Sequence, residues 1–197
     1  MLHKLKIACF PKLIVTIYYT GKGDDGETGT MGRGRIKKDS KLAVAMGDMD
    51  ELNSVVGVAI ANTPDERINS LLKVIQDRLF MVGAEISASV EGGAKLKFAL
   101  KEGSTKDLEK EIEEIGSRLP ELKKFVLPGG SLSASYLHLA RAVARRAERS
   151  VVALSTENKI NPALLQYLNR LSSFFFVAAL YMNKKEGIEE YNPTYLD

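Results

Sequence analysis

The stretch from Asn161 to Lys185 reads NPALLQYLNRLSSFFFVAALYMNKK, and it decides the fold. Asn161 is a strong N-cap candidate, and Pro162 stands at the first helical position, where its missing N–H costs nothing. Apolar residues then cover most of the helical circumference, which is typical of a helix buried among other elements. The sequence therefore predicts an all-α protein with this helix in its core.

Four further segments show helical apolar spacing between recognisable start and stop signals. They are Lys41–Asn62, Asp65–Ala88, Ser104–Arg118 and Leu132–Ser155. Ser104 or Thr105 is the expected N-cap of the third segment, and Ser131 or Ser133 that of the fourth. Five helices joined by short connections, with almost no strand signal, predict an up-and-down five-helix bundle.

The N-terminal part of the chain has a different pattern. Leu13–Tyr19 is β-branched and aromatic, which predicts a short extended segment, and Gly21–Gly34 is rich in glycine and predicts a loop. We expect residues 1–16 to be an extension without an assigned function and residues 17–187 to form one helical domain. Residues 188–197 are expected to be a C-terminal tail.

Charge and rare residue types limit the classes of function. The net charge of +3 at pH 7 is too small to indicate nucleic-acid binding. Cys9 is the one cysteine, and His3 and His138 are the two histidines, so no metal site built from these residues is expected. His138 is expected to be packed or half-exposed rather than to act as a ligand.

Nothing in the sequence indicates a membrane protein. The longest apolar run, Leu171–Met182, contains two serines and is too short to span a bilayer. Met1–Val15 is basic and apolar but lacks the hydrophobic region and cleavage site of a signal peptide. We therefore expect a cytoplasmic protein with no membrane contact.

The run Arg141-Ala-Val-Ala-Arg-Arg-Ala-Glu-Arg149 is the strongest indication of a binding site. On a helix, Arg141, Arg145 and Arg149 lie one above the next on a single face. Stacked guanidinium groups repel one another unless an anion lies against them, and their planar fork fits a carboxylate or a phosphate. The alternative is a solvated row of surface arginines, with Glu148 one turn from Arg145.

The glycine-rich segment is a second candidate for anion binding. Gly21-Lys-Gly-Asp-Asp-Gly26 has the spacing G-x-G-x-x-G, but no βαβ unit follows, and Glu27 stands where a P-loop needs lysine. Closely spaced glycines can still turn backbone N–H groups toward an anion. The surrounding cations and hydroxyls are Thr20, Lys22, Thr28, Arg33, Arg35, Lys37 and Lys38. A triphosphate cradle and a flexible, solvated loop both stay open.

Polar residues also interrupt two of the apolar helices. Asp48-Met-Asp50-Glu51 requires cationic partners if it is buried, and the arginine helix of the same or another subunit offers them; the alternative is an exposed face. Asn169 and Arg170 interrupt the fifth helix, where a buried amide would need a core hydrogen bond or a ligand. Phe174–Phe176 are expected in the core.

These motifs follow one another in a characteristic order along the chain. The segments concerned are Tyr19–Thr28, Arg35–Asp39, Gly47–Ser54, Phe125–Gly130, Arg141–Arg149 and Asn169–Ser172. Taken together, they closely resemble the PduO-type ATP:cob(I)alamin adenosyltransferases over about residues 17–185. The ordered set is highly specific, although no single segment is.

The resemblance implies a five-helix bundle that assembles as a homotrimer, with active sites between neighbouring subunits. It implies transfer of the 5′-deoxyadenosyl group of ATP to the cobalt of cob(I)alamin, which gives adenosylcobalamin and triphosphate. Mg²⁺ would accompany ATP. A reductase that delivers the electron and a cobalamin-dependent acceptor enzyme are the further partners that it implies.

The resemblance also implies roles for residues around ATP. Lys38, Glu148 and Asn169 match residues at the nucleotide site, and Arg145 matches the arginine that grips the polyphosphate. The N-terminal loop would place six residues near the phosphates: Thr20, Lys22, Gly23, Asp24, Gly26 and Thr28.

The resemblance implies roles for three more residues, two at the subunit boundary and one at the corrin. Arg141 matches an arginine that pairs with an aspartate across the boundary, and Asp50 matches that aspartate. Phe125 matches the aromatic side chain that closes the lower face of the corrin, where it would keep the lower ligand off cobalt and ease reduction. Because cobalt(I) is itself a strong nucleophile, the protein would contribute positioning and electrostatic stabilisation.

Two residues that depart from the family pattern support an alternative function. Gly21 stands where many relatives carry lysine, with Lys22 one place later, and Ser173 stands where relatives usually carry aspartate. Both changes fall in the nucleotide region. They leave open a regulatory trimer that binds a nucleotide without turnover.

Overall fold

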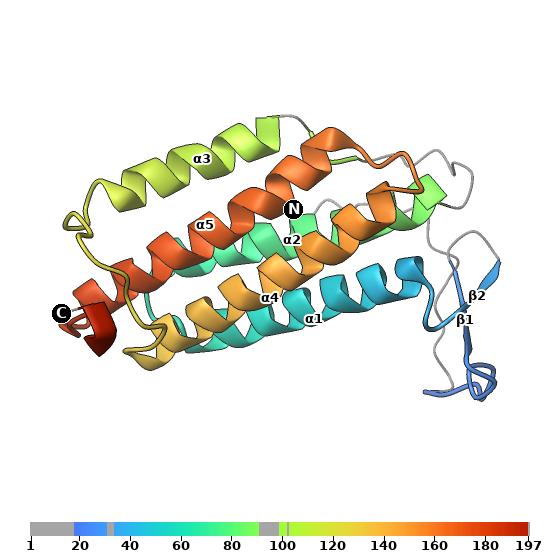
Figure 1. Cartoon of the computed structure of the whole chain (residues 1–197), viewed down its shortest axis with the longest axis horizontal. Helices are drawn as coiled ribbons and strands as arrows, with labels where there is room; N and C mark the ends of the chain where they lie inside the picture. The colour runs from blue at the N-terminus through green and yellow to red at the C-terminus, as the bar shows by residue number, and fades with distance from the viewer. Residues whose placement is uncertain (1–17, 31–33, 91–98, 102, 197) are drawn as a thin grey trace, which may run out of the picture.

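The computed structural model describes residues 18–30, 34–90, 99–101 and 103–196. Its helices are α1 (Lys41–Asn62), α2 (Glu66–Val90), α3 (Gly103–Gly116), α4 (Leu132–Ser155), α5 (Pro162–Lys185) and a short 3-10 turn, η1 (Thr194–Leu196). The five long helices run alternately in opposite directions (Figure 1), which confirms the predicted up-and-down bundle. His3, Cys9 and Arg33 lie outside the described residues.

Side-chain caps fix where the helices begin. Ser131 Oγ accepts from the Ala134 N–H at 3.2 Å, and Asn161 Oδ1 accepts from the Ala163 N–H at 3.0 Å. The predicted bounds of α1 and α4 and the start of α5 are therefore confirmed. An N-cap at Ser104 or Thr105 is wrong, because the Ser104 N–H already bonds the Lys101 carbonyl and the helix begins at Gly103.

The core forms between α5 and its neighbours. α5 packs on α4 and α3, α4 packs on α1, and α1 packs on α2. Tyr167, Phe174 and Phe175 are fully buried, as expected for a core helix. The expectation is wrong for Phe176, which is half-buried, because consecutive helical residues point about 100° apart and three phenylalanines cannot face one way.

α5 is the one helix in the described ranges that is long and apolar enough to cross a membrane by length and composition. More than half of its most apolar window (56%) is buried inside the bundle. Its apolar surface therefore packs against protein, which is how the core helix of a soluble bundle is built.

The N-terminal segment differs from the prediction in two ways. Of the predicted extended segment Leu13–Tyr19, only Tyr18 and Tyr19 are described; both are exposed and belong to no sheet, and the rest of the segment lies outside the described residues. The glycine-rich segment is not entirely loop, because β1 (Glu27–Gly29) pairs antiparallel with β2 (Arg35–Lys37), with Thr28 opposite Ile36. Figure 1 shows this hairpin at the end of the bundle where α1 begins.

Asp65 links the connection between α1 and α2 to the end of α5. Its Oδ1 accepts from the Ile68 N–H at 2.8 Å, and its Oδ2 accepts from the Lys185 ammonium. Burial raises the pKa of the Asp65 carboxyl, but the bonds with Lys185 and Ile68 outweigh burial and leave the pKa below its ordinary value. The ionised form is therefore the one that stabilises the fold.

We predict that Asp65→Ala lowers the free energy of unfolding by about 1–2 kcal/mol at pH 7, because it removes both a cap and an ion pair. The loss should shrink as pH falls through the range in which Asp65 takes up a proton, since the native state then loses the same interactions. Urea unfolding at pH 7 and pH 3 measures both effects. An equal loss at the two pH values would contradict this account.

Candidate active site

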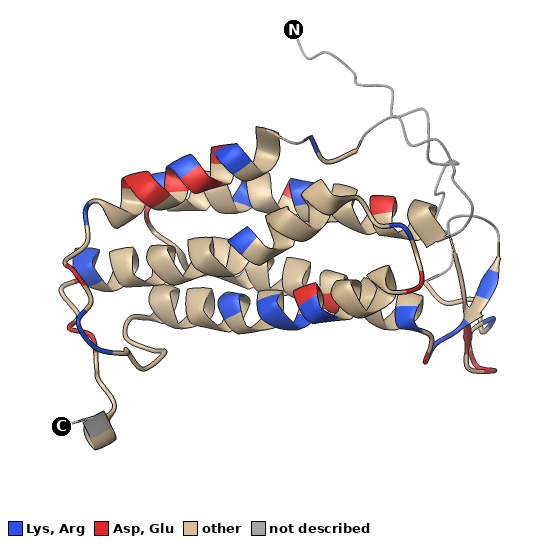
Figure 2. Ribbon diagram, turned by 45° about the horizontal axis from the view of Figure 1, so that its top comes forward, with Lys and Arg blue, Asp and Glu red and all other residues tan. Residues whose placement is uncertain are grey.

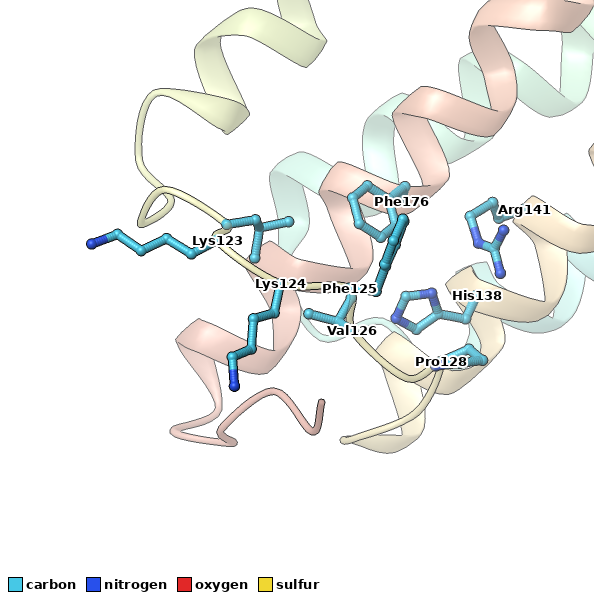
Figure 3. Close-up of a pocket in the computed structure, with 9 residues that line it drawn as sticks. Lys123, Lys124, Phe125, Val126, Pro128, His138, Arg141 and Phe176 are labelled. Carbon is cyan, nitrogen blue, oxygen red and sulfur yellow. The ribbon is translucent and has the colours of Figure 1, made fainter. Parts of the chain in front are cut away.

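A pocket with a volume of about 830 Å³ opens beside the first half of α4 (Figure 3). It is lined by Leu122, Lys123, Lys124, Phe125, Val126, Pro128, His138, Arg141 and Phe176. Most of these side chains are apolar or aromatic, and the volume is that of sites for sizeable organic ligands. The pocket can therefore accept a large ligand with an extended apolar face.

Phe125 stands at the mouth of this pocket with 78% of its surface exposed. Figure 3 shows Phe125 next to Phe176, and the ring centroids of Phe176 and His138 are 6.1 Å apart. Gly130, with φ of +104°, and the Ser131 cap turn the chain sharply into α4 directly after this segment. An aromatic wall at the pocket mouth is thus held next to a rigid helix start.

His138 is buried, and the ordinary expectation of a packed histidine is confirmed. Only 4% of its surface is exposed, and neither ring nitrogen has a hydrogen-bond partner among the described residues. Burial and the charge of Arg141 lower its pKa to about 4. Arg141 Nε, one turn along α4, is also buried without a partner in the described chain. Unsatisfied polar atoms on a pocket wall indicate a missing ligand or protein partner.

We predict that His138 stays neutral well below the ordinary histidine pKa of 6.5. As pH falls from 6.5 toward 4, the unfolded chain binds this proton before the native state does, so stability should decrease over that window. NMR titration, with His138→Gln to assign the signal, measures the pKa. A midpoint near 6.5 would show that the ring is not desolvated as described.

The predicted arginine row is present on α4, but its members have different surroundings. Arg145 and Arg149 are exposed, whereas Arg141 is half-buried in the pocket wall. No ion pair of these three arginines is found within the part of the chain that the structure describes. The row is therefore free to bind an anion supplied from outside the chain.

Arg146 is the arginine that binds the acidic cluster of α1, a role that the sequence did not reveal. Its Nε lies 3.4 Å from Asp48 Oδ1, its Nη2 bonds Glu51, and Ser150 donates to Asp48. Glu51 and then Asp48 raise the pKa of Arg146. In Figure 2, basic and acidic positions lie close together in the lower part of the bundle, where α4 packs on α1.

Asp50 is excluded from this cluster, because successive helical residues point in different directions. It is exposed and borders a small hollow between α1 and α2 that Met46 and Phe80 also line. Among the described residues, Asp50 has no cationic partner, so the predicted pair with Arg141 does not form within one chain.

The structure brings Glu148 and Asn169 together, as two residues of one site should be. Asn169 Nδ2 donates to Glu148 Oε1 at 2.8 Å, and Asn169 Oδ1 accepts from Arg170 at 3.3 Å. Asn169 is exposed rather than buried, because α5 reaches the surface between α3 and α4 at this point. There Arg170 also bonds Glu109 of α3 at 2.8 Å.

The N-terminal loop is held by its own contacts rather than being simply solvated. Arg35 bonds the Lys22 carbonyl at 2.6 Å, Asp25 at 3.0 Å and Glu27 at 2.9 Å. Lys38 Nζ donates to the Gly23 carbonyl at 2.7 Å. The sequence placed Arg35 only among the surrounding cations, because its partners become visible only once the hairpin is known.

Glycines shape this loop at two points. Gly21 and Gly26 have φ of +67° and +82°, a region that other residues rarely adopt. Of the predicted phosphate-binding residues, Lys22 and Asp24 lie in the turns so formed, Thr20 precedes them and Thr28 follows them in β1. Their side chains are exposed or half-buried, so they are available to a ligand.

The predicted site residues therefore form two clusters in one chain. The glycine-rich loop and Lys38 lie where α1 begins, whereas the pocket with Phe125 lies at the opposite end of the bundle, where α4 begins (Figure 1). The structure does not bring Lys22 or Gly23 to Arg145 within one chain. No group of three or more acidic, histidine or cysteine side chains that could hold a metal occurs in the described ranges.

Comparison with known proteins agrees with the fold. The sequence profile of the cobalamin adenosyltransferase family matches residues 18–182. A corrinoid adenosyltransferase of Bacillus subtilis is 44% identical over 174 residues, which are 86% of this chain and 88% of that protein. The chain belongs to the cobalamin adenosyltransferase family.

The similar solved structures include PduO-type ATP:corrinoid adenosyltransferases. A variant of a PduO-type ATP:corrinoid adenosyltransferase from Lactobacillus reuteri, complexed with cobalamin and ATP, matches with a TM-score of 0.84. It is 36% identical, and the match covers 89% of this chain and 98% of that one. Another variant of that type from Lactobacillus reuteri, complexed with ATP, gives 37% identity, a TM-score of 0.81, and coverage of 89% and 99%.

Proposed function

We propose that this protein transfers the 5′-deoxyadenosyl group of ATP to the cobalt of cob(I)alamin, giving adenosylcobalamin and triphosphate. One observation carries the proposal: α4 combines a large apolar pocket with a row of arginines that have no ion-pair partner among the described residues. The pocket suits a corrin, and the arginines suit a polyphosphate. Membership of the cobalamin adenosyltransferase family supports the same reaction.

The protein would act as a homotrimer, with each site built by two subunits. Two observations support this: the loop and the pocket lie at opposite ends of one chain, and Asp50 and Arg141 have no ion-pair partner among the residues that the structure describes. In a trimer, Asp50 would pair with Arg141 of the partner subunit. Large exposed apolar side chains on α1, α2 and α4 offer surface for such contacts: Val44, Val58, Val74, Phe80, Leu139 and Val152.

Binding of the triphosphate would draw on both clusters. Arg145 would grip the polyphosphate, the Glu148–Asn169 pair would contact the nucleotide, and Lys38 would add a further cation. The loop would surround the phosphates with Thr20, Lys22, Gly23, Asp24, Gly26 and Thr28. Fixed cations near the leaving triphosphate would stabilise the charge that develops as it departs.

Mg²⁺ is part of this proposal only as a companion of ATP. The described residues provide no cluster of three metal ligands, so phosphate oxygens and water would supply most of its coordination. Of the loop carboxylates, Asp25 is already bound to Arg35, whereas Asp24 is exposed. Asp24 is therefore the loop carboxylate that could reach the ion or its water.

Phe125 would act on the corrin rather than on the nucleotide. An aromatic ring below the corrin excludes the lower ligand from cobalt, which makes cob(II)alamin easier to reduce. The resulting cobalt(I) is a strong nucleophile, so the remaining task is to hold C5′ of ATP in line with it. A cytoplasmic location, a separate reductase and a cobalamin-dependent acceptor enzyme complete the proposal.

An anaerobic assay with ATP and chemically reduced cobalamin tests the reaction directly. The proposal requires the spectrum of adenosylcobalamin to appear at a rate proportional to protein concentration. ATP binding without any transfer, at every corrinoid concentration tried, would instead favour the regulatory trimer that the departures at Gly21 and Ser173 leave open.

We predict that Arg145→Ala lowers kcat/KM for ATP by about 100-fold or more, because one donor to the developing charge is lost. The fold should persist, since Arg145 is exposed and no core contact depends on it. Arg118→Ala is the matched control: Arg118 is an exposed arginine paired with Glu114 at the far end of α3. Comparable losses in both variants would argue against a specific phosphate contact.

Arg141→Ala and Asp50→Ala should each weaken catalysis or assembly, and the double variant should be little worse than either single one. The reason is that each substitution removes the same ion pair between subunits. Activity and the mass measured by light scattering are compared across the four proteins. Additive losses would show that Arg141 and Asp50 do not pair.

A further inference from the structure

The segment that leads into α4 is hydrogen-bonded along its length to the C-terminal end of the chain. We call residues 125–131 the strap and residues 187–196 the tail. Asn192 Nδ2 donates to the Phe125 carbonyl at 2.7 Å, and the Leu127 N–H donates to the Tyr191 carbonyl at 2.7 Å. The tail thus binds the strap backbone at Phe125 itself and two residues further on.

Asn183 at the end of α5 continues the same series of bonds. Its Nδ2 donates to the Gly129 carbonyl at 3.0 Å, and its Oδ1 accepts from the Ser131 N–H at 2.9 Å. Only 1% of Asn183 is exposed, and a Cβ on Gly130 would lie 2.2 Å from its Oδ1. Together, the tail and Asn183 bond every second residue of the strap, from Phe125 to Ser131.

The end of α5 directs the tail back toward the strap. Gly187 has φ of +70°, and the Ile188 N–H bonds the Asn183 carbonyl at 2.9 Å, which closes the helix and reverses the chain. Glu190 Oε1 then accepts from Asn183 Nδ2 at 3.1 Å. This fixed path delivers Tyr191 and Asn192 to the backbone of Phe125 and Leu127.

The start of the strap has little packing around it, because it borders two hollows. One is the 830 Å³ pocket, and the other, of about 580 Å³, is lined by residues 119–124, Val126, the end of α5 and part of the tail. Val126 lines both hollows, and Phe125 is mostly exposed. Packing alone therefore leaves the backbone at Phe125 free to shift, and the bonds from the tail restrain it.

We propose that Asn192 is a positioning residue that fixes Phe125 against the corrin, and that the tail is a working part of the site. This inference rests on the proposed function. The sequence predicted only a C-terminal tail here, without a function. The tail also lies beyond the family match, which ends at residue 182. Asn192 acts through Phe125 and touches neither substrate.

Asn192→Ala tests this role, with Tyr195→Ala as the matched control, because Tyr195 is an exposed tail residue that leaves the bonds to Phe125 and Leu127 intact. We expect Asn192→Ala to lower kcat/KM for the corrinoid by about 2- to 10-fold, the effect of losing one exposed hydrogen bond that holds the Phe125 backbone. The Kd for ATP should not change.

Two further readouts separate positioning from a general structural effect. The fraction of bound cob(II)alamin that has lost its lower ligand, measured by electron paramagnetic resonance, should fall in Asn192→Ala and not in Tyr195→Ala. Hydrogen exchange at the Leu127 amide should accelerate in the same variant, while Tm and amides within α4 stay as in the parent protein.

The outcomes distinguish this inference from the proposed function. If the parent protein neither binds cobalamin nor forms adenosylcobalamin, the proposed function fails. If the parent protein is active and Asn192→Ala matches Tyr195→Ala in ligand loss, in Leu127 exchange and in kcat/KM, the positioning role of Asn192 is overturned.

Discussion

The packing of α4 against α1 and α5 is the constraint on which the rest of the molecule depends. Small residues at Ala140, Ala144 and Ala147 are buried on that side and let the neighbouring helices approach closely. Helical periodicity then directs Arg145 and Arg149 outward. The same contacts that build the core therefore also present on the surface two cations without an ion-pair partner in the described part of the chain, where an anion can reach them.

The other half of the site depends on backbone geometry rather than on charge. The turn at Gly130 sets the direction of α4, and hydrogen bonds from Asn183, Tyr191 and Asn192 hold the strap that carries Phe125. Phe125 thus lies on a segment that is neither helix nor strand, and hydrogen bonds restrain that segment. Loops restrained in this way commonly carry binding residues on a rigid scaffold.

Most of the fold could be predicted because its signals are local: apolar spacing, the Ser131 and Asn161 caps, and Pro162. The β1–β2 hairpin could not, since its strands are short and rich in glycine and charge, and the bonds of Arg35 to Glu27 and Asp25 become visible only once the strands are paired. The roles of Arg146 and Asn192 could not be predicted either, because their partners lie on distant segments of the chain. The candidate site residues were proposed from their types and their order along the chain, but their separation into two clusters required the structure.

The central claim is that the cations of α4 and the glycine-rich loop meet on one triphosphate, and that this requires two copies of the chain. A crystal structure with ATP and cob(II)alamin tests it most directly. The account predicts a triphosphate between Arg145 of one subunit and the loop of its neighbour, with Phe125 below the corrin. A nucleotide bound wholly within one chain, with the arginine row facing solvent, would contradict it.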